Sequence, residues 1–177
     1  MTKSIVILVW SCAASLLAQD APRSTPAPTS WKPLEFLVGT WEARTTQGGS
    51  AGAASLGTYS FQLELRDNVL ARHSRTAGCQ GPADFNCEHG DILYIYQEAP
   101  EQLKAIYFDS EGHVIHYDVS TPAPSTAIFL SSPSQPGPQF KLSYELKGSI
   151  MSGKFQMRMP GQAEFKSYLE WEGRSRK

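Results

Sequence analysis

Apolar and polar positions alternate along most of the chain after Trp41, and this is the period expected of extended strands. In Leu56–Leu65, for example, Tyr59 and Phe61 fall on one face and polar residues fall on the other. A turn containing Asp and Asn follows, and Val69–Thr76 is predicted to return as the hairpin partner. The pattern is typical of a half-buried antiparallel strand pair.

About ten such runs occur, and no segment has the length and period of a long helix. The predicted strands are Trp41–Thr46, Leu56–Leu65, Val69–Thr76, Ile92–Gln97, Leu103–Phe108, His113–Val119, Ala127–Ser131, Phe140–Leu146, Ile150–Met159 and Phe165–Glu172. Most of them are joined by hairpin-length turns. The sequence therefore predicts an all-β, antiparallel up-and-down meander.

The segment Leu34–Ala43 (LEFLVGTWEA) is predicted to close one end of this sheet. Its apolar cluster is too short for an independent helix, and Gly39 permits a bend before Trp41 opens the first strand. We interpret it as an N-terminal plug, which favours a closed barrel of about ten strands with an interior too wide for side chains alone to fill. A β-sandwich is the alternative fold.

The N-terminus has the features of a secretory signal peptide at residues 1–18. Lys3 precedes a mostly apolar run that is short for a membrane span of about 20 residues, and Ala18 is a small residue at its exit. Residues 19–30 form a linker rich in Pro, Ser and Thr, and residues 31–177 form the barrel domain. We expect export to the periplasm or the medium; lipidation of Cys12 is the alternative.

The charge balance and the remaining cysteines narrow the chemistry. The net charge is −1, so the chain lacks the basic footprint of a nucleic-acid or anionic-membrane binder. Cys79 and Cys87 are predicted to form a disulfide in an oxidising compartment. The alternative is a metal site that adds His89, but its spacing matches no standard zinc pattern, and we expect no metal.

The residues of the plug also carry a resemblance. Leu34–Glu42 resembles the G-x-W opening of lipocalin-like calycin barrels. More specifically, it is similar to bacterial domains of unknown function related to nitrobindin, which begin L-x-F-L-x-G-x-W, and Ala105–Tyr117 is similar to their central hairpin. The resemblance covers most of the chain from Leu34 to Trp171 and implies a ten-stranded barrel, but it implies no agreed activity.

Two further expectations come from this resemblance. In G-x-W calycins an Arg near the end of the barrel packs on the opening Trp, which implies that Arg174 stacks on Trp41 and that both residues, with Gly39, are structural. Nitrobindins bind haem through a histidine on a late strand, whereas no histidine follows His116 in this sequence. We therefore expect no haem and no other cofactor; His73 or His116 would be the remaining axial-ligand candidates.

Alternation also groups side chains that could line the interior and bind a ligand. The candidates are His73, Arg75, Tyr94, Tyr107, His116, Tyr144, Arg158 and Tyr168. Aromatic rings with a few cationic groups suit an amphiphilic molecule with an acidic or carbonyl head. Solvent-facing positions for His73 and Arg75, and a surface His116–Asp118 pair, are the alternatives.

The sequence lacks a nucleophile elbow, an H-E-x-x-H motif, a phosphate-binding loop and a calcium loop. We therefore expect an exported barrel that binds an apolar or amphiphilic small molecule, has no nucleic-acid partner and keeps no transmembrane segment after signal cleavage. One alternative is a hydrolase or isomerase that uses His116 or His73 as general base. The other is an envelope structural module without a ligand.

Overall fold

The computed structural model describes residues 30–47, 55–79, 89–132 and 137–176. Within them, one short 3₁₀ helix precedes ten strands. The elements are η1 (Lys32–Leu37), β1 (Gly39–Gln47), β2 (Ser55–Glu64), β3 (Val69–Cys79), β4 (Gly90–Ala99), β5 (Gln102–Asp109), β6 (Val114–Ala123), β7 (Thr126–Ser131), β8 (Gln139–Lys147), β9 (Ile150–Arg158) and β10 (Lys166–Ser175).

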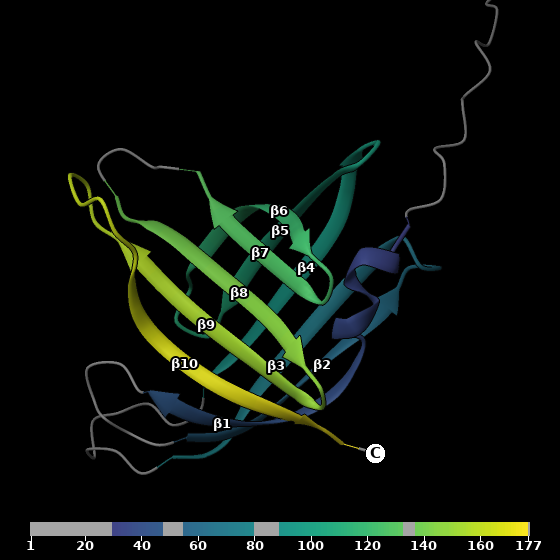
Figure 1. The fold of residues 1–177 in the computed structure, drawn as a ribbon, viewed down its shortest axis with the longest axis horizontal. Coiled ribbons are helices and arrows are strands. Elements are labelled where there is room, and N and C mark those ends of the chain that lie inside the picture. Colours follow the sequence, from purple (N-terminus) through teal and green to yellow (C-terminus); the bar gives the residue numbers. More distant parts are fainter. Residues whose placement is uncertain (1–29, 48–54, 80–88, 133–136, 177) are drawn as a thin grey trace, which may run out of the picture.

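The ten strands form a closed barrel. Each strand pairs in antiparallel fashion with its neighbours in the sequence, and β1 pairs with β10, where Trp41 lies opposite Ser175 and Arg44 opposite Glu172. In Figure 1 the strands β7–β10 cross in front of β3–β5. This confirms the predicted up-and-down barrel and shows that the alternative sandwich is wrong.

The plug is the 3₁₀ helix η1, which lies at the end of the barrel where β2 turns into β3 (Figure 1). Leu34 and Leu37 are fully buried in the core. The indole Nε1 of Trp31 donates a hydrogen bond of 2.7 Å to the carbonyl of Asp67 in the β2–β3 turn. Gly39 then starts β1 with a φ of +130°, a backbone angle that favours glycine. The plug is therefore held by apolar burial and by a bond to the turn.

Trp41 anchors the junction between η1 and β1, but it does so without Arg174. Its indole Nε1 donates 2.9 Å to the carbonyl of Leu37, and its ring stacks on Tyr59 at a centroid distance of 6.4 Å. Arg174 is exposed and lies opposite Glu42 in the sheet, whereas Trp41 is buried. The expected stacking of Arg174 on Trp41 is wrong because alternation puts these two side chains on opposite faces of the wall.

Apolar side chains fill the centre of the interior. The buried core consists of Trp31, Leu34, Leu37, Trp41, Tyr59, Phe61, Leu70, Leu93, Ile95, Ala105, Ile115, Tyr117, Ala127, Phe129, Leu142, Tyr144, Met151 and Trp171. The rings of Phe61 and Phe129 both contact Tyr144, with centroids 5.4 and 6.1 Å apart and near-perpendicular planes. Such edge-on contacts are favourable aromatic geometry, so the core is well packed next to the plug.

The end of the barrel opposite the plug, which we call the rim, carries the β5–β6 turn and the start of β4. Inner-face residues near the plug, such as Phe61 and Leu70, are fully buried. In contrast, Tyr107, Phe140 and Phe155 are only half-buried although they pack against the core from the inner face. Solvent therefore reaches the interior from the rim side.

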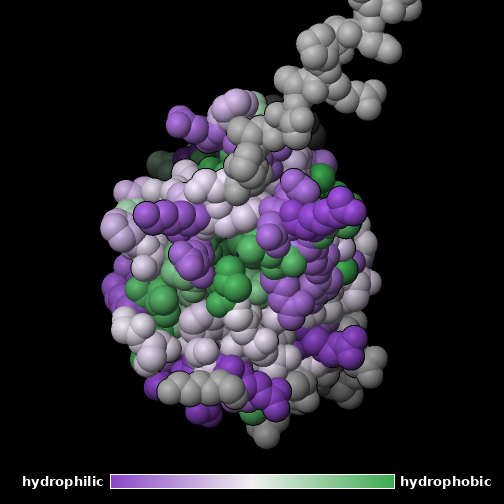
Figure 2. Space-filling view, turned by 90° about the vertical axis from the view of Figure 1, so that its right-hand side faces the viewer, coloured by the Kyte–Doolittle hydropathy of each residue, from purple (hydrophilic) through white to green (hydrophobic). Residues whose placement is uncertain are grey.

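The plug end also carries apolar surface. Figure 2 views the molecule from the side of η1 and shows apolar patches between polar side chains. Exposed apolar residues here include Val38, directly after η1, and Leu63 and Leu65 of the β2–β3 hairpin. Scattered residues of this kind are common on protein surfaces.

Several sequence predictions fall outside the described residues. They are the signal peptide at residues 1–18, the lipidation site Cys12 and the linker up to residue 29. The predicted Cys79–Cys87 disulfide belongs with them, because Cys87 is not described and Cys79 is described only as backbone of β3. Among the described helices, none has the length and apolar character needed to cross a membrane.

Candidate binding site in the barrel interior

A buried ion pair lies inside the barrel. Arg72 on β3 and Asp91 on β4 form a contact between Nη1 and Oδ1, and each side chain is only 7% exposed. Their positions follow from the register: Asp91 lies opposite Ser74, so it is the diagonal neighbour of Arg72 on the inner face. Burial alone would lower the pKa of Arg72, but Asp91 holds it above its ordinary value. The guanidinium therefore stays charged.

Aromatic side chains surround the Arg72 guanidinium. Its Cζ lies 5.3 Å from the ring centroid of Tyr59 on β2 and 6.0 Å from that of Tyr144 on β8. Trp171 on β10 packs against Tyr144 at 5.7 Å, nearly perpendicular. Tyr117 on β6 faces the same interior and is 2% exposed. Because the contributing strands are far apart in sequence, only closure of the barrel brings these groups together.

Five buried polar atoms in this cluster have no hydrogen-bond partner among the described residues. They are the hydroxyls of Tyr59, Tyr117 and Tyr144, the Nε of Arg72 and the Nε1 of Trp171. Most buried polar groups in proteins are hydrogen-bonded, and one left unmade costs about 1–3 kcal/mol. Five in one interior are therefore polar groups that the packing of the described residues leaves unsatisfied.

The hydroxyls of this cluster are donors at neutral pH. Burial raises the pKa of Tyr59 to about 12, and it also raises the pKa values of Tyr117 and Tyr144 above the ordinary tyrosine range. Trp171 lies close enough to the Tyr59 hydroxyl to lower its pKa slightly, but the two groups fall short of hydrogen-bond geometry. We call this set of atoms the interior donor cluster.

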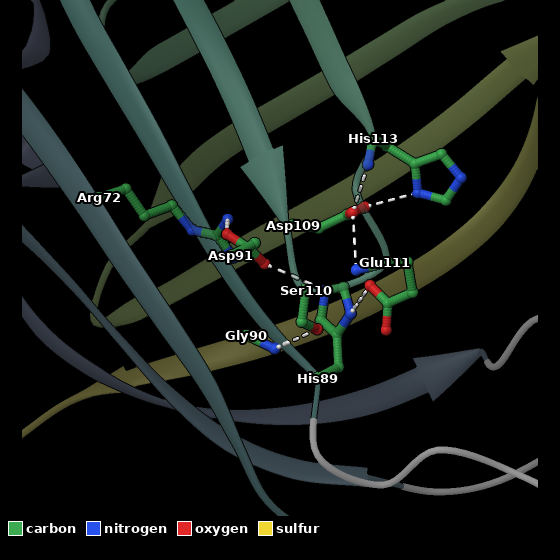
Figure 3. A network of polar contacts seen from close by, with 8 residues as sticks. All are labelled: Arg72, His89, Gly90, Asp91, Asp109, Ser110, Glu111 and His113. Atoms are coloured by element: carbon green, nitrogen blue, oxygen red, sulfur yellow. Dashed lines mark hydrogen bonds and ion pairs between the residues drawn. The ribbon is translucent and has the colours of Figure 1, made fainter.

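A polar network at the rim continues from Asp91 (Figure 3). The Nε2 of His89 lies 3.4 Å from Asp91 Oδ2, and its Nδ1 lies 2.9 Å from Glu111 Oε2 in the β5–β6 turn. The hydrogen bond to Asp91, opposed by partial burial and helped by the bond to Glu111, raises the pKa of His89 to about 9. His89 is therefore cationic at neutral pH and joins the buried pair to the surface.

The β5–β6 turn is folded by the carboxylate of Asp109. Its Oδ1 accepts hydrogen bonds from the backbone N–H groups of Glu111 (3.1 Å) and His113 (2.8 Å), and its Oδ2 lies 2.8 Å from the His113 Nδ1. Burial alone would raise the pKa of Asp109, but the bonds from His113 hold it below its ordinary value. Ser110 Oγ also accepts a bond of 3.2 Å from the Gly90 N–H, which ties the turn to β4.

The same turn offers the side chains that could hold a metal ion. One ligand atom each from Asp109, Glu111 and His113 lies within 4.8 Å of the others. These atoms are engaged in the hydrogen bonds of the turn, and Glu111 and His113 are exposed. We assign them to folding of the turn, since exposed carboxylates and histidines often adjoin without an ion.

We expect the His89 imidazole to titrate near pH 9, well above its ordinary value of 6.5. Because the folded state holds the proton more tightly, the contribution of His89 to stability is complete below pH 6.5 and is lost as the pH rises through 9. NMR titration of the His89 ring protons measures this directly. Glu111→Gln should lower the pKa, and a wild-type value near 6.5 would contradict the network.

Two of the eight candidates from the sequence lie on the inner face. Tyr144 is fully buried beside Arg72. Tyr107 is half-buried and packs against the core from β5, and burial raises its pKa. Both belong to the surroundings of the buried ion pair.

Four other candidates lie on the outer face, which corrects the expectation that they line the interior. His73 and Arg75 are exposed because the side chains of Leu70 and Arg72 point inward on β3, so the positions that alternate with Arg72 point outward. Tyr94 alternates with the buried Leu93 and packs edge-on against His73, 6.4 Å away. His116 alternates with the buried Ile115 and Tyr117 and is exposed.

The predicted His116–Asp118 surface pair is replaced by another contact. Asp118 is bound by Lys104 of the neighbouring strand at 2.6 Å. His116 borders a shallow surface depression together with Tyr96 and Lys104. The outer wall therefore carries an ordinary surface ion pair.

The last two candidates lie at the rim and serve packing. Arg158 is half-buried, bonds to Gln139 Oε1 and lies 4.6 Å from the ring centroid of Phe165. Tyr168 is 50% exposed and meets Phe155 edge-on at 6.1 Å. Neither contacts the interior donor cluster.

The sequence prediction missed Arg72, Asp91 and Trp171. Val69, Leu70 and Ala71 form an unbroken apolar run, so their pattern does not reveal which face of β3 points inward. The β2–β3 turn contained the missing information. Pairing Glu64 with Val69 across that turn puts Arg72 opposite Phe61, and opposite residues share a face.

Comparisons with known proteins show the fold and no more. No family model matches the chain, and no curated protein matches it. The crystal structure of Rv2717c from M. tuberculosis is similar, with a TM-score of 0.59 and 16% sequence identity over 86% of this chain and 100% of that chain. At this identity the likeness is one of barrel architecture.

Proposed function

We propose that this chain is an exported binding protein of the lipocalin and nitrobindin type that holds one amphiphilic organic molecule inside its barrel. The ligand lies on the rim side of Arg72, with its polar head on the interior donor cluster and its apolar part against Tyr107 and Trp171. The periplasm or the medium is its location. No nucleic acid takes part, since the net charge is −1.

The observation that carries this proposal is the interior donor cluster. Its five donors converge from five strands, and among the described residues they have no hydrogen-bond partner. Inward-facing rings toward the rim are half-buried, which supports entry of a ligand from that side. An aromatic wall with a few convergent polar groups is the usual composition of a small-molecule site.

The placement of the histidines weighs against haem binding and against catalysis inside the barrel. His73 and His116 are exposed on the outer wall, so neither fits an axial ligand of an interior haem. For the same reason neither offers a general base to a substrate inside the barrel. The residues that face the interior suit binding better than either role.

Variants that lack an interior hydroxyl test whether the interior donor cluster binds a ligand. We expect the purified chain to carry one organic molecule in native mass spectrometry and to lose it on denaturation. Tyr117→Phe and Tyr144→Phe keep the rings but remove a donor, so they should lower occupancy by about 3- to 10-fold per lost hydrogen bond. The matched control is Tyr94→Phe on the outer wall, which should change nothing.

The stability of the same variants identifies what satisfies the donors. If the hydroxyls have no hydrogen-bond partner in the free protein, the interior Tyr→Phe variants should unfold at equal or higher urea concentration than wild type. Folded protein without an organic adduct, together with a lower urea midpoint for Tyr117→Phe and Tyr144→Phe but not for Tyr94→Phe, would indicate that ordered water satisfies the hydroxyls and would refute the proposal.

A further inference from the structure

The charges buried near the interior donor cluster already balance one another. Among the described residues, Arg72 and Asp91 are the buried charged side chains, and they form an ion pair. The contact with Asp91 uses Nη1, whereas Nε has no partner. Arg72 therefore offers a hydrogen bond to a ligand, and its charge is balanced within a chain of two cations and two anions, because Asp91 also contacts the cationic His89 and His89 contacts Glu111.

The pKa values of the tyrosine hydroxyls indicate whether this interior favours a negatively charged oxygen. Burial raises the pKa of Tyr117 and Tyr144 above the ordinary range even though nearby Arg72 acts to lower both values. For both hydroxyls Asp91 adds to the increase. An anionic oxygen placed beside these groups would meet the same desolvation, which the nearby Arg72 offsets only in part.

The free polar atoms favour an acceptor. The Nε of Arg72 and the Nε1 of Trp171 can only donate, and each of the three protonated hydroxyls can donate one hydrogen bond and can also accept. A carbonyl oxygen has two lone pairs and no net charge, so it satisfies such donors without adding a buried ion.

We propose that the head group bound in the barrel is an uncharged acceptor, such as an amide, ester or ketone carbonyl, and that the site discriminates against carboxylates. The inference rests on the proposed function, because it specifies the class of molecule that this interior takes. It narrows the ligand to neutral amphiphiles that carry a carbonyl group.

Matched pairs of probes test the charge preference. Benzamide, 2-naphthamide and decanamide are each compared with the corresponding carboxylate by isothermal titration calorimetry at pH 7. The amide and carboxylate of each pair have nearly the same shape and differ in charge. A carboxylate loses much more hydration than an amide on entering this buried site, so we expect the amides to bind at least about tenfold more tightly.

The pH dependence provides a second readout. The groups that act on Arg72 are Asp91 and the tyrosines Tyr59, Tyr107, Tyr117 and Tyr144, and His89 contacts Asp91. The hydroxyls, the guanidinium and the His89 imidazolium keep their protons between pH 6 and 8. Amide affinity should therefore stay constant over this range. Carboxylate affinity should fall about tenfold per pH unit, because only the protonated acid enters.

The outcomes separate the inference from the proposed function. Equal or tighter binding of the carboxylates, or binding of neither class, overturns the inference. The proposed function is overturned as well if neither amides nor carboxylates bind and the native mass spectrum shows no adduct. In Asp91→Asn the charge of Arg72 is no longer neutralised, so the preference should shift toward the carboxylates if the variant folds.

Discussion

Arg72→Met is expected to lower the free energy of unfolding by about 3–5 kcal/mol. The substitution leaves the Asp91 carboxylate 7% exposed inside the barrel, with His89 at 3.4 Å as its remaining cationic neighbour. A buried charge without its partner is strongly unfavourable, whereas loss of the pair as a whole is tolerated better. Urea denaturation followed by tryptophan fluorescence measures the change.

Two further variants complete this experiment. Arg72→Met combined with Asp91→Leu removes both charges and should recover most of the lost stability. Lys104→Met breaks the exposed contact with Asp118 on the outer wall and should have a much smaller effect. A loss below about 1 kcal/mol in Arg72→Met would contradict a desolvated ion pair and would indicate that water reaches Asp91 freely.

Gly153→Ala should destabilise the barrel by about 2–3 kcal/mol, because the new methyl group would collide with Trp171. A Cβ at Gly153 would lie 2.1 Å from Cε2 of the Trp171 indole and 2.3 Å from Cζ2. Gly153 lies directly opposite both Trp171 and Tyr144 in the sheet, and the indole covers it. The ring cannot move aside without disturbing Tyr144, which it contacts at 5.7 Å.

The matched control is Gly90→Ala, where a Cβ would meet only the carbonyl oxygen of Ser74 at 3.6 Å. Urea denaturation gives the stability, and near-ultraviolet circular dichroism reports the indole environment. A Gly153→Ala variant that behaves like Gly90→Ala in both measurements would show that Trp171 does not lie against this glycine. If the indole also lines the ligand site, the same variant should bind the amide probes less tightly.

The barrel and its plug were predictable from local patterns. Alternation in β2 and β6, turn residues between strands, and the LEFLVG run before Trp41 each act over a few residues, so their signal is present in a single sequence. The strand faces were not predictable in the same way. In β3 apolar residues occupy both faces, and the inward position belongs to Arg72, which runs against the general preference of arginine for the surface.

The contents of the site depend on partners that are distant in the chain. Arg72 tolerates burial because Asp91 lies diagonal to it across the sheet, and Trp171 fits because Gly153 lacks a side chain. Each of these pairings is set by register rather than by neighbouring residues. Arg174 illustrates the converse: its distance from the end of the chain suited a contact with Trp41, but the register places it opposite Glu42 on the outer face.

The pairing of β1 with β10 has a consequence for how the protein is made. Trp41 meets Ser175, so the first and last strands must find each other across nearly the whole chain, and such high contact order slows folding. Until β10 has been synthesised, the growing sheet presents two free edges that invite intermolecular pairing. Pairing of the final strand with β1 closes the cylinder and removes both free edges.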